Sequence, residues 1–173
     1  MRAGQFRPVV AVVGPGDDAS ESAVADAESV GRLLADNGWI TLCGGVDAGV
    51  MAAAARGASA GGGLSIGLLP GFDRAAAAPE LTGALPTGLG QARNAVLVTA
   101  ADAVVGCGLN PGTLSELALA LRAGKPTVLV HPREDAAALL ASLAAAAPFY
   151  AAPTPGEAVA WLERHLGQQP RDG

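Results

Sequence analysis

Aromatic and charged side chains are scarce in this 173-residue chain. Only 3% of the residues are aromatic and 16% are charged, whereas 50% are hydrophobic, so the core must consist of Ala, Val, Leu and Ile. This composition excludes intrinsic disorder. The net charge is -5 and no basic stripe is present, which argues against a nucleic-acid or anionic-membrane partner.

Long apolar runs and clustered cysteines are also missing. The longest Ala/Leu run, residues 136–147, is too short to span a bilayer, and the first eight residues lack the apolar core of a secretory signal. We therefore expect a cytoplasmic protein. Cys43 and Cys107 match neither a metal-ligand spacing nor a disulfide framework, so we expect two free thiols and no metal site.

Short apolar runs alternate with segments of helical periodicity, which is typical of a parallel sheet with helices on both faces. We predict a doubly wound, Rossmann-like α/β fold with three α/β/α layers and the strand order 3-2-1-4-5. One domain is expected over residues 1–168, followed by a frayed tail at 169–173. The predicted strands are 8–14, 39–45, 64–70, 103–108 and 126–130; the predicted helices are 20–37, 48–60, 89–102, 113–123, 134–146 and a last one opening at Thr154.

The remaining segment, residues 71–88, reads as a long loop. Asp18 and Glu21 read as a capping pair for the first helix, and Thr113 and Glu116 as a capping box for the fourth.

Glycine-rich turns follow three of the predicted strands, at residues 14–20, 44–49 and 106–113. In doubly wound sheets ligands bind beyond the carboxyl ends of the strands, where the strand order reverses. Glycine allows close approach of the backbone, and helix N-termini attract anions. The three turns therefore predict a crevice for a phosphate-bearing ligand. NAD is not expected, because the first turn lacks the third glycine of the dinucleotide fingerprint.

Each candidate side chain also has a purely structural interpretation. Arg93 fits a solvated helix position, Asn94 a cap or a surface amide, and Asp47 the end of a turn. His131 and His165 have no sequence neighbours that suggest metal or triad chemistry, and both are interpreted as structural.

Four stretches in one order resemble the LOG-type Rossmann superfamily, once labelled lysine-decarboxylase-like. They are residues 44–58, 66–71, 92–98 and 112–126, and the resemblance covers about residues 8–160. Residues 92–94 (ARN) and 49–58 (GVMAAAARGA) resemble the branch of molybdenum cofactor carrier proteins. That branch implies binding of a pyranopterin monophosphate without turnover.

A second branch of the superfamily contains cytokinin-activating phosphoribohydrolases, which cleave the N-glycosidic bond of adenosine monophosphates. It implies catalytic roles for Arg93 and Glu116. Either branch implies a molybdenum cofactor (molybdopterin) or an AMP-like nucleotide as ligand, and a homodimer or homotetramer. The ligand-binding residues expected on this basis are Gly14, Gly16, Gly44, Gly45, Asp47, Gly49, Met51, Arg93, Asn94, Gly108, Asn110, Gly112, Thr113 and Glu116.

One loop departs from the superfamily pattern, and the old decarboxylase label does not fit the chain. Leu109, Asn110 and Pro111 stand where glycines precede the GT dipeptide, and Pro111 removes a backbone donor, so we expect a phosphate holder of altered design. The decarboxylase label fails because pyridoxal phosphate requires a Schiff-base lysine. The sole lysine, Lys125, precedes a strand and so is expected at the edge opposite the crevice.

Overall fold

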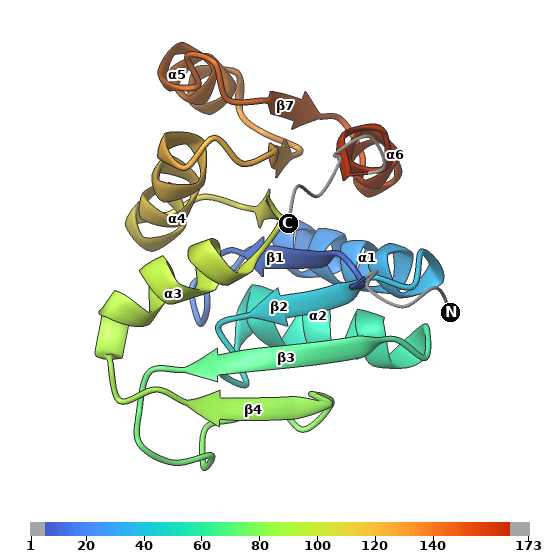
Figure 1. Ribbon diagram of the computed structural model, residues 1–173, viewed down its shortest axis with the longest axis vertical. Helices are drawn as coiled ribbons and strands as arrows, with labels where there is room; N and C mark the ends of the chain where they lie inside the picture. The colour runs from blue at the N-terminus through green and yellow to red at the C-terminus, as the bar shows by residue number, and fades with distance from the viewer. Residues whose placement is uncertain (1–5, 167–173) are drawn as a thin grey trace.

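The computed structural model describes residues 6–166, which build one seven-stranded parallel sheet (Figure 1). The strand order is β4-β3-β2-β1-β5-β6-β7, so the order reverses between β1 and β5. The strands are β1 (Val9–Val13), β2 (Ile40–Cys43), β3 (Leu64–Leu69), β4 (Gly83–Pro86), β5 (Ala103–Cys107), β6 (Thr127–Val130) and β7 (Phe149–Ala152).

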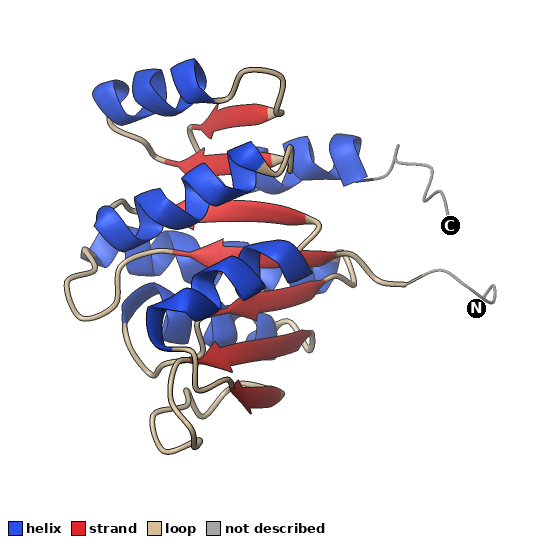
Figure 2. Cartoon of the chain, turned by 60° about the vertical axis from the view of Figure 1, so that its left-hand side comes forward, coloured by secondary structure: helices blue, strands red, loops and turns tan. Residues whose placement is uncertain are grey.

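Helices cover both faces of the sheet, and the strands end at a common edge (Figure 2). The helices α1, α2 and α6 pack on one face, and α3, α4 and α5 on the other. They are α1 (Glu21–Asp36), α2 (Gly49–Ala60), α3 (Arg93–Ala100), α4 (Pro111–Arg122), α5 (Glu134–Leu143) and α6 (Pro155–Leu166), with a 3₁₀ turn, η1 (Gly90–Ala92), before α3.

The central strand β1 shows how the two layers arise. Val10 and Val12 pack with α1, α2 and α6, whereas Ala11 and Val13 pack with α3 and α4. Successive side chains of a strand point to opposite faces, so a continuous run of small apolar residues serves both layers. The predicted doubly wound, three-layer α/β/α fold is confirmed.

The predicted order of five strands is also confirmed, but two edge strands were missed. β4 lies inside the segment interpreted as a long loop and pairs with β3, while β7 pairs with β6. Both are four residues long and only partly buried. β4 begins with glycine and ends with proline, and β7 continues an alanine-rich stretch interrupted by Pro148, so neither stands out as a separate strand. The predicted frayed tail lies outside the described residues.

Two helix starts differ from the predicted ones. Ser20, not Asp18, caps α1, because its hydroxyl accepts a hydrogen bond from the Ala23 amide. Helix α4 begins at Pro111 with Asn110 as its cap, so the predicted capping box at Thr113 and Glu116 is wrong. At α6 the predicted start is correct, since Thr154 accepts from the Glu157 amide.

Lys125 precedes β6 and so lies at the amino edge of the sheet, opposite the crevice. The two cysteines are the buried last residues of β2 and β5. The Lys125 ammonium donates to the carbonyls of Thr99 and Ala101 at the C-terminal end of α3. Cys43 and Cys107 are free and buried, and they lie on β2 and β5 with β1 between them. No helix within residues 6–166 is long and apolar enough to cross a membrane.

Candidate functional site

A cavity of about 610 Å³ opens at the carboxyl edge of the sheet, where the strand order reverses between β1 and β5. Its volume lies in the range of small-molecule sites. It takes residues from the end of β1, the start of α2, the segment of η1 and α3, and the first turns of α4. Nine of the expected ligand-binding residues line it: Gly14, Gly44, Met51, Arg93, Asn94, Asn110, Gly112, Thr113 and Glu116.

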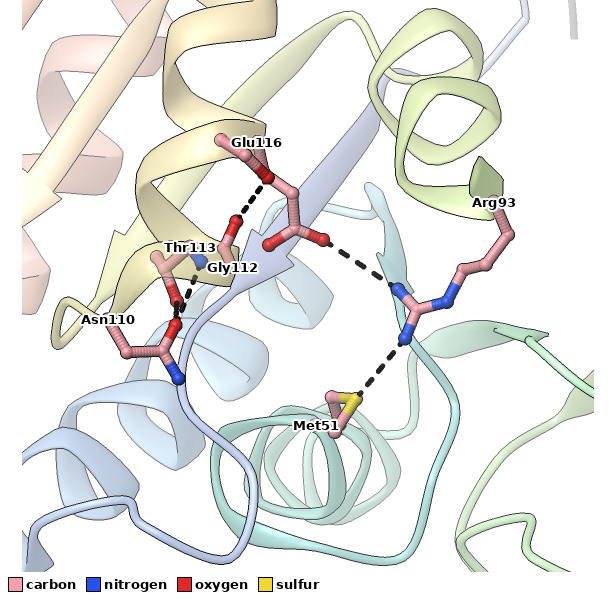
Figure 3. A network of polar contacts seen from close by, with 7 residues as sticks. Met51, Arg93, Asn110, Gly112, Thr113 and Glu116 are labelled. Atoms are coloured by element: carbon pink, nitrogen blue, oxygen red, sulfur yellow. Dashed lines mark hydrogen bonds and ion pairs between the residues drawn. The ribbon is translucent and has the colours of Figure 1, made fainter. Parts of the chain in front are cut away.

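The centre of this crevice is a buried ion pair between α3 and α4 (Figure 3). Arg93 Nη1 lies 3.7 Å from Glu116 Oε1, and the two side chains are only 11% and 8% exposed. On its other side, Nη2 of the guanidinium donates a weak hydrogen bond to the Met51 sulfur at 3.9 Å. Arg93 Nε is buried and has no hydrogen-bond partner among the described residues. The guanidinium therefore keeps donor capacity for a ligand.

Burial governs the charge of both partners. Desolvation raises the pKa of Glu116 to about 7, against the opposing attraction of Arg93. Desolvation also lowers the pKa of Arg93, partly offset by Glu116 and Cys43. The Glu116 carboxyl thus exchanges a proton near neutral pH, whereas an arginine stays charged.

The position of the guanidinium depends on Gly44, the residue directly after β2. A Cβ at Gly44 would lie 2.5 Å from Arg93 Nη2 and 2.5 Å from the Met51 sulfur. Contacts this short force the neighbours to shift, and here the neighbours are the ends of two side chains, so only glycine leaves both of them in these positions. At Gly14 a Cβ would collide with the Cys107 carbonyl and Val50, so this glycine lets β1 and the β5 turn approach each other.

The start of α4 supplies the polar wall opposite Arg93. Asn110 Oδ1 accepts from the Thr113 amide at 2.9 Å and from the Thr113 hydroxyl at 3.0 Å. Pro111 has no amide hydrogen and suits the first helical position. In the described part of the chain, the Gly112 amide finds no acceptor, and it borders the crevice at the positive end of the helix. The Asn-Pro pair thus opens the helix and leaves one amide for a ligand.

Five expected site residues lie outside the cavity lining. They shape the turns behind it: Gly45 packs on Gly67, Gly49 on the Gly16 carbonyl, and Gly108 on Ala23 and Pro15. The Asp47 amide donates to the Ala76 carbonyl. These positions are Gly16, Gly45, Asp47, Gly49 and Gly108.

Sequence reasoning missed the segment just before Arg93. Gly90, Gln91 and Ala92 line the crevice together with Pro70. The glycine pair at Gly88 and Gly90, both with positive φ, was the available signal for a turn there. Also missed was a contact outside the crevice, in which His131 Nδ1 lies 2.8 Å from Asp26 Oδ2. Those two residues stand 105 positions apart, so no sequence pattern joins them.

These features define a class: a doubly wound Rossmann-like protein with a ligand crevice at the switch point of its sheet. The model of the SLOG cluster4 family matches residues 7–159, and the chain belongs to that family. A relative, an uncharacterised protein of Archaeoglobus fulgidus, is 36% identical over 124 residues, which make up 71% of this chain and 80% of the relative.

Two solved structures are similar over nearly the whole chain. The molybdenum cofactor binding protein of Rippkaea orientalis is 35% identical, with a TM-score of 0.89, covering 93% of this chain and 98% of that one. The molybdenum cofactor carrier protein of Chlamydomonas reinhardtii is 36% identical, with a TM-score of 0.87, covering 94% and 100%. The predicted resemblance to the superfamily and to its carrier branch is confirmed.

Proposed function

We propose that this protein binds the molybdenum cofactor, a phosphorylated pterin, in the crevice between β1 and β5 and serves as its carrier. The observation that carries the proposal is the buried Arg93 guanidinium, which faces a cavity of about 610 Å³ with its Nε unpartnered among the described residues. The similarity to the two molybdenum cofactor proteins supports this choice of ligand.

In this proposal Arg93 is the principal phosphate ligand. A phosphate dianion is a stronger partner for a guanidinium than a carboxyl that is partly protonated near neutral pH. The ligand phosphate then takes the place of Glu116 beside the guanidinium. The free Gly112 amide adds a hydrogen bond at the positive end of α4, where Thr113 donates to the cap residue Asn110 and holds it in place. Met51 and Asn94 border the remaining space.

The test compares cofactor carried by the wild type and by Arg93→Ala after expression in a cofactor-producing host. Bound pterin is oxidised after isolation and measured by its fluorescence. Loss of a charge-assisted hydrogen bond costs roughly 1.5–3 kcal/mol. The affinity for the pterin, calculated from the fraction of protein that carries it, should therefore fall by about ten- to a hundredfold. Arg93→Lys should recover only part of it, because an ammonium cannot make the two-pronged contact.

Arg56 provides the matched control. It lies on α2, its side chain is 40% exposed and pairs with Glu28 at 3.4 Å, and it does not line the crevice. Arg56→Ala removes the same charge and should leave the bound pterin unchanged. Equal pterin in the wild type and Arg93→Ala would refute the role of Arg93.

The Arg93–Glu116 pair also favours a second candidate, hydrolysis of the N-glycosidic bond of AMP-like nucleotides. Arg93 would hold the 5'-phosphate, and Glu116 would stabilise the oxocarbenium-like centre or orient water. Incubation with AMP and N6-substituted AMP, followed by chromatography of the free base, tests this candidate. Turnover that Glu116→Gln abolishes would favour the hydrolase over the carrier.

We further propose that the protein works in the cytoplasm as a homodimer or homotetramer. The exposed apolar side chains around the β3–β4 edge, among them Phe72 and Leu85, support self-association. The phosphorylated ligand, not a nucleic acid or a membrane, is the proposed partner, in keeping with the net charge of -5.

A further inference from the structure

A second cavity, of about 450 Å³, opens beside the first turn of α1 and the connection from β6 to α5. It shares no lining residue with the crevice. The turn after β5 lies between the two, since Gly108 and Leu109 line the second cavity and Asn110 lines the crevice. The proposed function makes no use of this second cavity.

The main polar feature of the second cavity is His131, whose ring is oriented by Asp26. His131 Nδ1 lies 2.8 Å from Asp26 Oδ2. The Asp26 side chain is only 11% exposed, whereas that of His131 is 51% exposed. When the ring is neutral and donates from Nδ1 to the Asp26 carboxylate, Nε2 keeps its lone pair. The ring therefore offers an acceptor nitrogen.

The backbone at His131 is held in an unusual conformation. His131 directly follows β6 and has a φ of +44°, in the left-handed region that non-glycine residues rarely adopt. Its amide donates to the Ala152 carbonyl at 2.9 Å, which fixes the backbone there. Conformations of this kind persist where the surroundings enforce them, and they gather at functional sites.

The other lining residues are largely apolar or already paired. Leu109 and Leu139 are large apolar side chains that remain exposed, at 39% and 46%. Arg133 forms an ion pair with Asp135 at 2.6 Å, so its charge is compensated. The cavity thus combines an acceptor nitrogen with an uncovered apolar wall, which suits a flat apolar molecule that carries a hydrogen-bond donor.

We propose that this second cavity binds a small nitrogen heterocycle, whose ring N–H donates a hydrogen bond to Nε2 of His131 while its faces cover Leu109 and Leu139. Such a ring carries both the N–H donor that His131 can accept and the flat apolar surface that can cover the two leucines. This site is independent of the phosphate-holding crevice, because Arg93 and Glu116 belong to the other cavity.

Histidine NMR tests the proposal directly, because the chain has only two histidines. His165 is the internal control: its Nδ1 contacts the Trp161 carbonyl at 2.8 Å and its ring stacks on Trp161. At pH 8, ring ¹⁵N spectra of the intact protein should show His131 as the Nδ1–H tautomer. The Nε2–H tautomer at His131 would overturn the proposal.

Titration with two matched probes then measures the donor requirement. Benzimidazole has a ring N–H, and 1-methylbenzimidazole lacks it at nearly the same size. Benzimidazole should shift the His131 Nε2 resonance saturably and leave His165 unmoved, and the methylated probe should bind at least about tenfold more weakly. Equal binding of both probes, no saturable shift, or a shift produced by inorganic phosphate in their place would each contradict the proposal.

Variants separate the two cavities. His131→Asn keeps a residue that tolerates positive φ but removes Nε2, so benzimidazole binding should be lost. Asp26→Asn should weaken binding, because the Asn amide can donate to Nδ1 as well as accept from it and so no longer fixes the tautomer. Arg93→Ala should leave the benzimidazole affinity unchanged, whatever it does to the binding of a phosphorylated pterin. A loss in Arg93→Ala equal to that in His131→Asn would place the probe in the crevice and overturn the proposal.

Discussion

The missing side chain of Gly44 creates the space that the Arg93 guanidinium occupies. A methyl group at this position would displace both the guanidinium and the Met51 sulfur, each 2.5 Å from the ideal Cβ. Gly44→Ala should therefore lower the affinity for AMP by about ten- to a hundredfold, as loss of the phosphate contact would. Titration calorimetry measures this change.

Gly16 supplies the control for that substitution. A Cβ there would lie 3.5 Å from the Met51 methyl carbon, an ordinary van der Waals contact. Gly16→Ala should change the AMP affinity less than about twofold. A similar loss in the two variants would show that general strain in the turns, not the position of Arg93, controls binding.

Glu116 should make stability depend on pH in one direction. Its pKa rises from 4.5 to about 7 on folding, so the folded protein binds this proton more tightly than the unfolded chain. Its contribution to the free energy of unfolding is therefore full below pH 4.5 and falls as the pH rises toward 7. Glu116→Gln lacks this dependence.

We predict that the free energy of unfolding of Glu116→Gln, taken relative to that of the wild type, rises by roughly 1–3 kcal/mol as the pH is raised from 5 to 8. Urea unfolding of both proteins at each pH measures the difference, and other titrating groups cancel in the comparison. Parallel stability curves would mean that Glu116 is not held in a desolvated environment.

Residue types and their spacing predicted part of the site. Arg93 and Glu116, 23 positions apart, were identified through motifs, and the fold brings them into one ion pair. The pairing of His131 with Asp26 could not be predicted, because it depends on the packing of α1 against the end of β6. Glycines that line the crevice and glycines that shape the turns behind it look alike in sequence. Only their three-dimensional neighbours distinguish Gly44 from Gly45.

Among the structural elements, central strands and long helices were predictable because burial imposes an apolar pattern on them. The edge strand β4 has exposed positions, a glycine at its start and a proline at its end, so it resembles a loop. The start of α4 was misplaced for a different reason. Asn110 and Pro111 form a strong start signal, but the Thr-x-x-Glu pattern three residues later fits a capping box equally well.

The cap of α4 yields a prediction of its own. Asn110→Ala removes the acceptor for the Thr113 amide and hydroxyl, so the free energy of unfolding should fall by about 1 kcal/mol. Asn110→Ser keeps a capping oxygen and should lose only a few tenths. Urea denaturation measures both. A neutral effect of Asn110→Ala would mean that Pro111 alone fixes the helix start.

For the molecule as a whole, burial of the two thiols reports on the integrity of the fold. Burial raises the pKa of Cys43 to about 11 and raises that of Cys107 further. The thiolate is the reactive form, so neither cysteine should react with Ellman's reagent in the native protein. Two thiols should react after unfolding in urea without reductant. Fewer than two would reveal a bridge, which the intervening strand β1 forbids in this fold.

Self-association is the last prediction, and it concerns the surface around the β3–β4 edge. Phe72 is 90% exposed and Leu85 is 50% exposed, and β4 is the edge strand, with no further strand beyond it within residues 6–166. Exposed apolar side chains beside an open strand edge favour contact with another chain. We expect a dimer or tetramer in sedimentation velocity at micromolar concentration, and a shift to monomer in Phe72→Asp.

Leu143→Asp, on the far helix α5, is the control: it places the same charge on a residue that is 53% exposed and should leave the assembly intact. A wild-type monomer would refute self-association. An assembly that only Leu143→Asp dissolves would move the interface to α5, where it would border the second cavity.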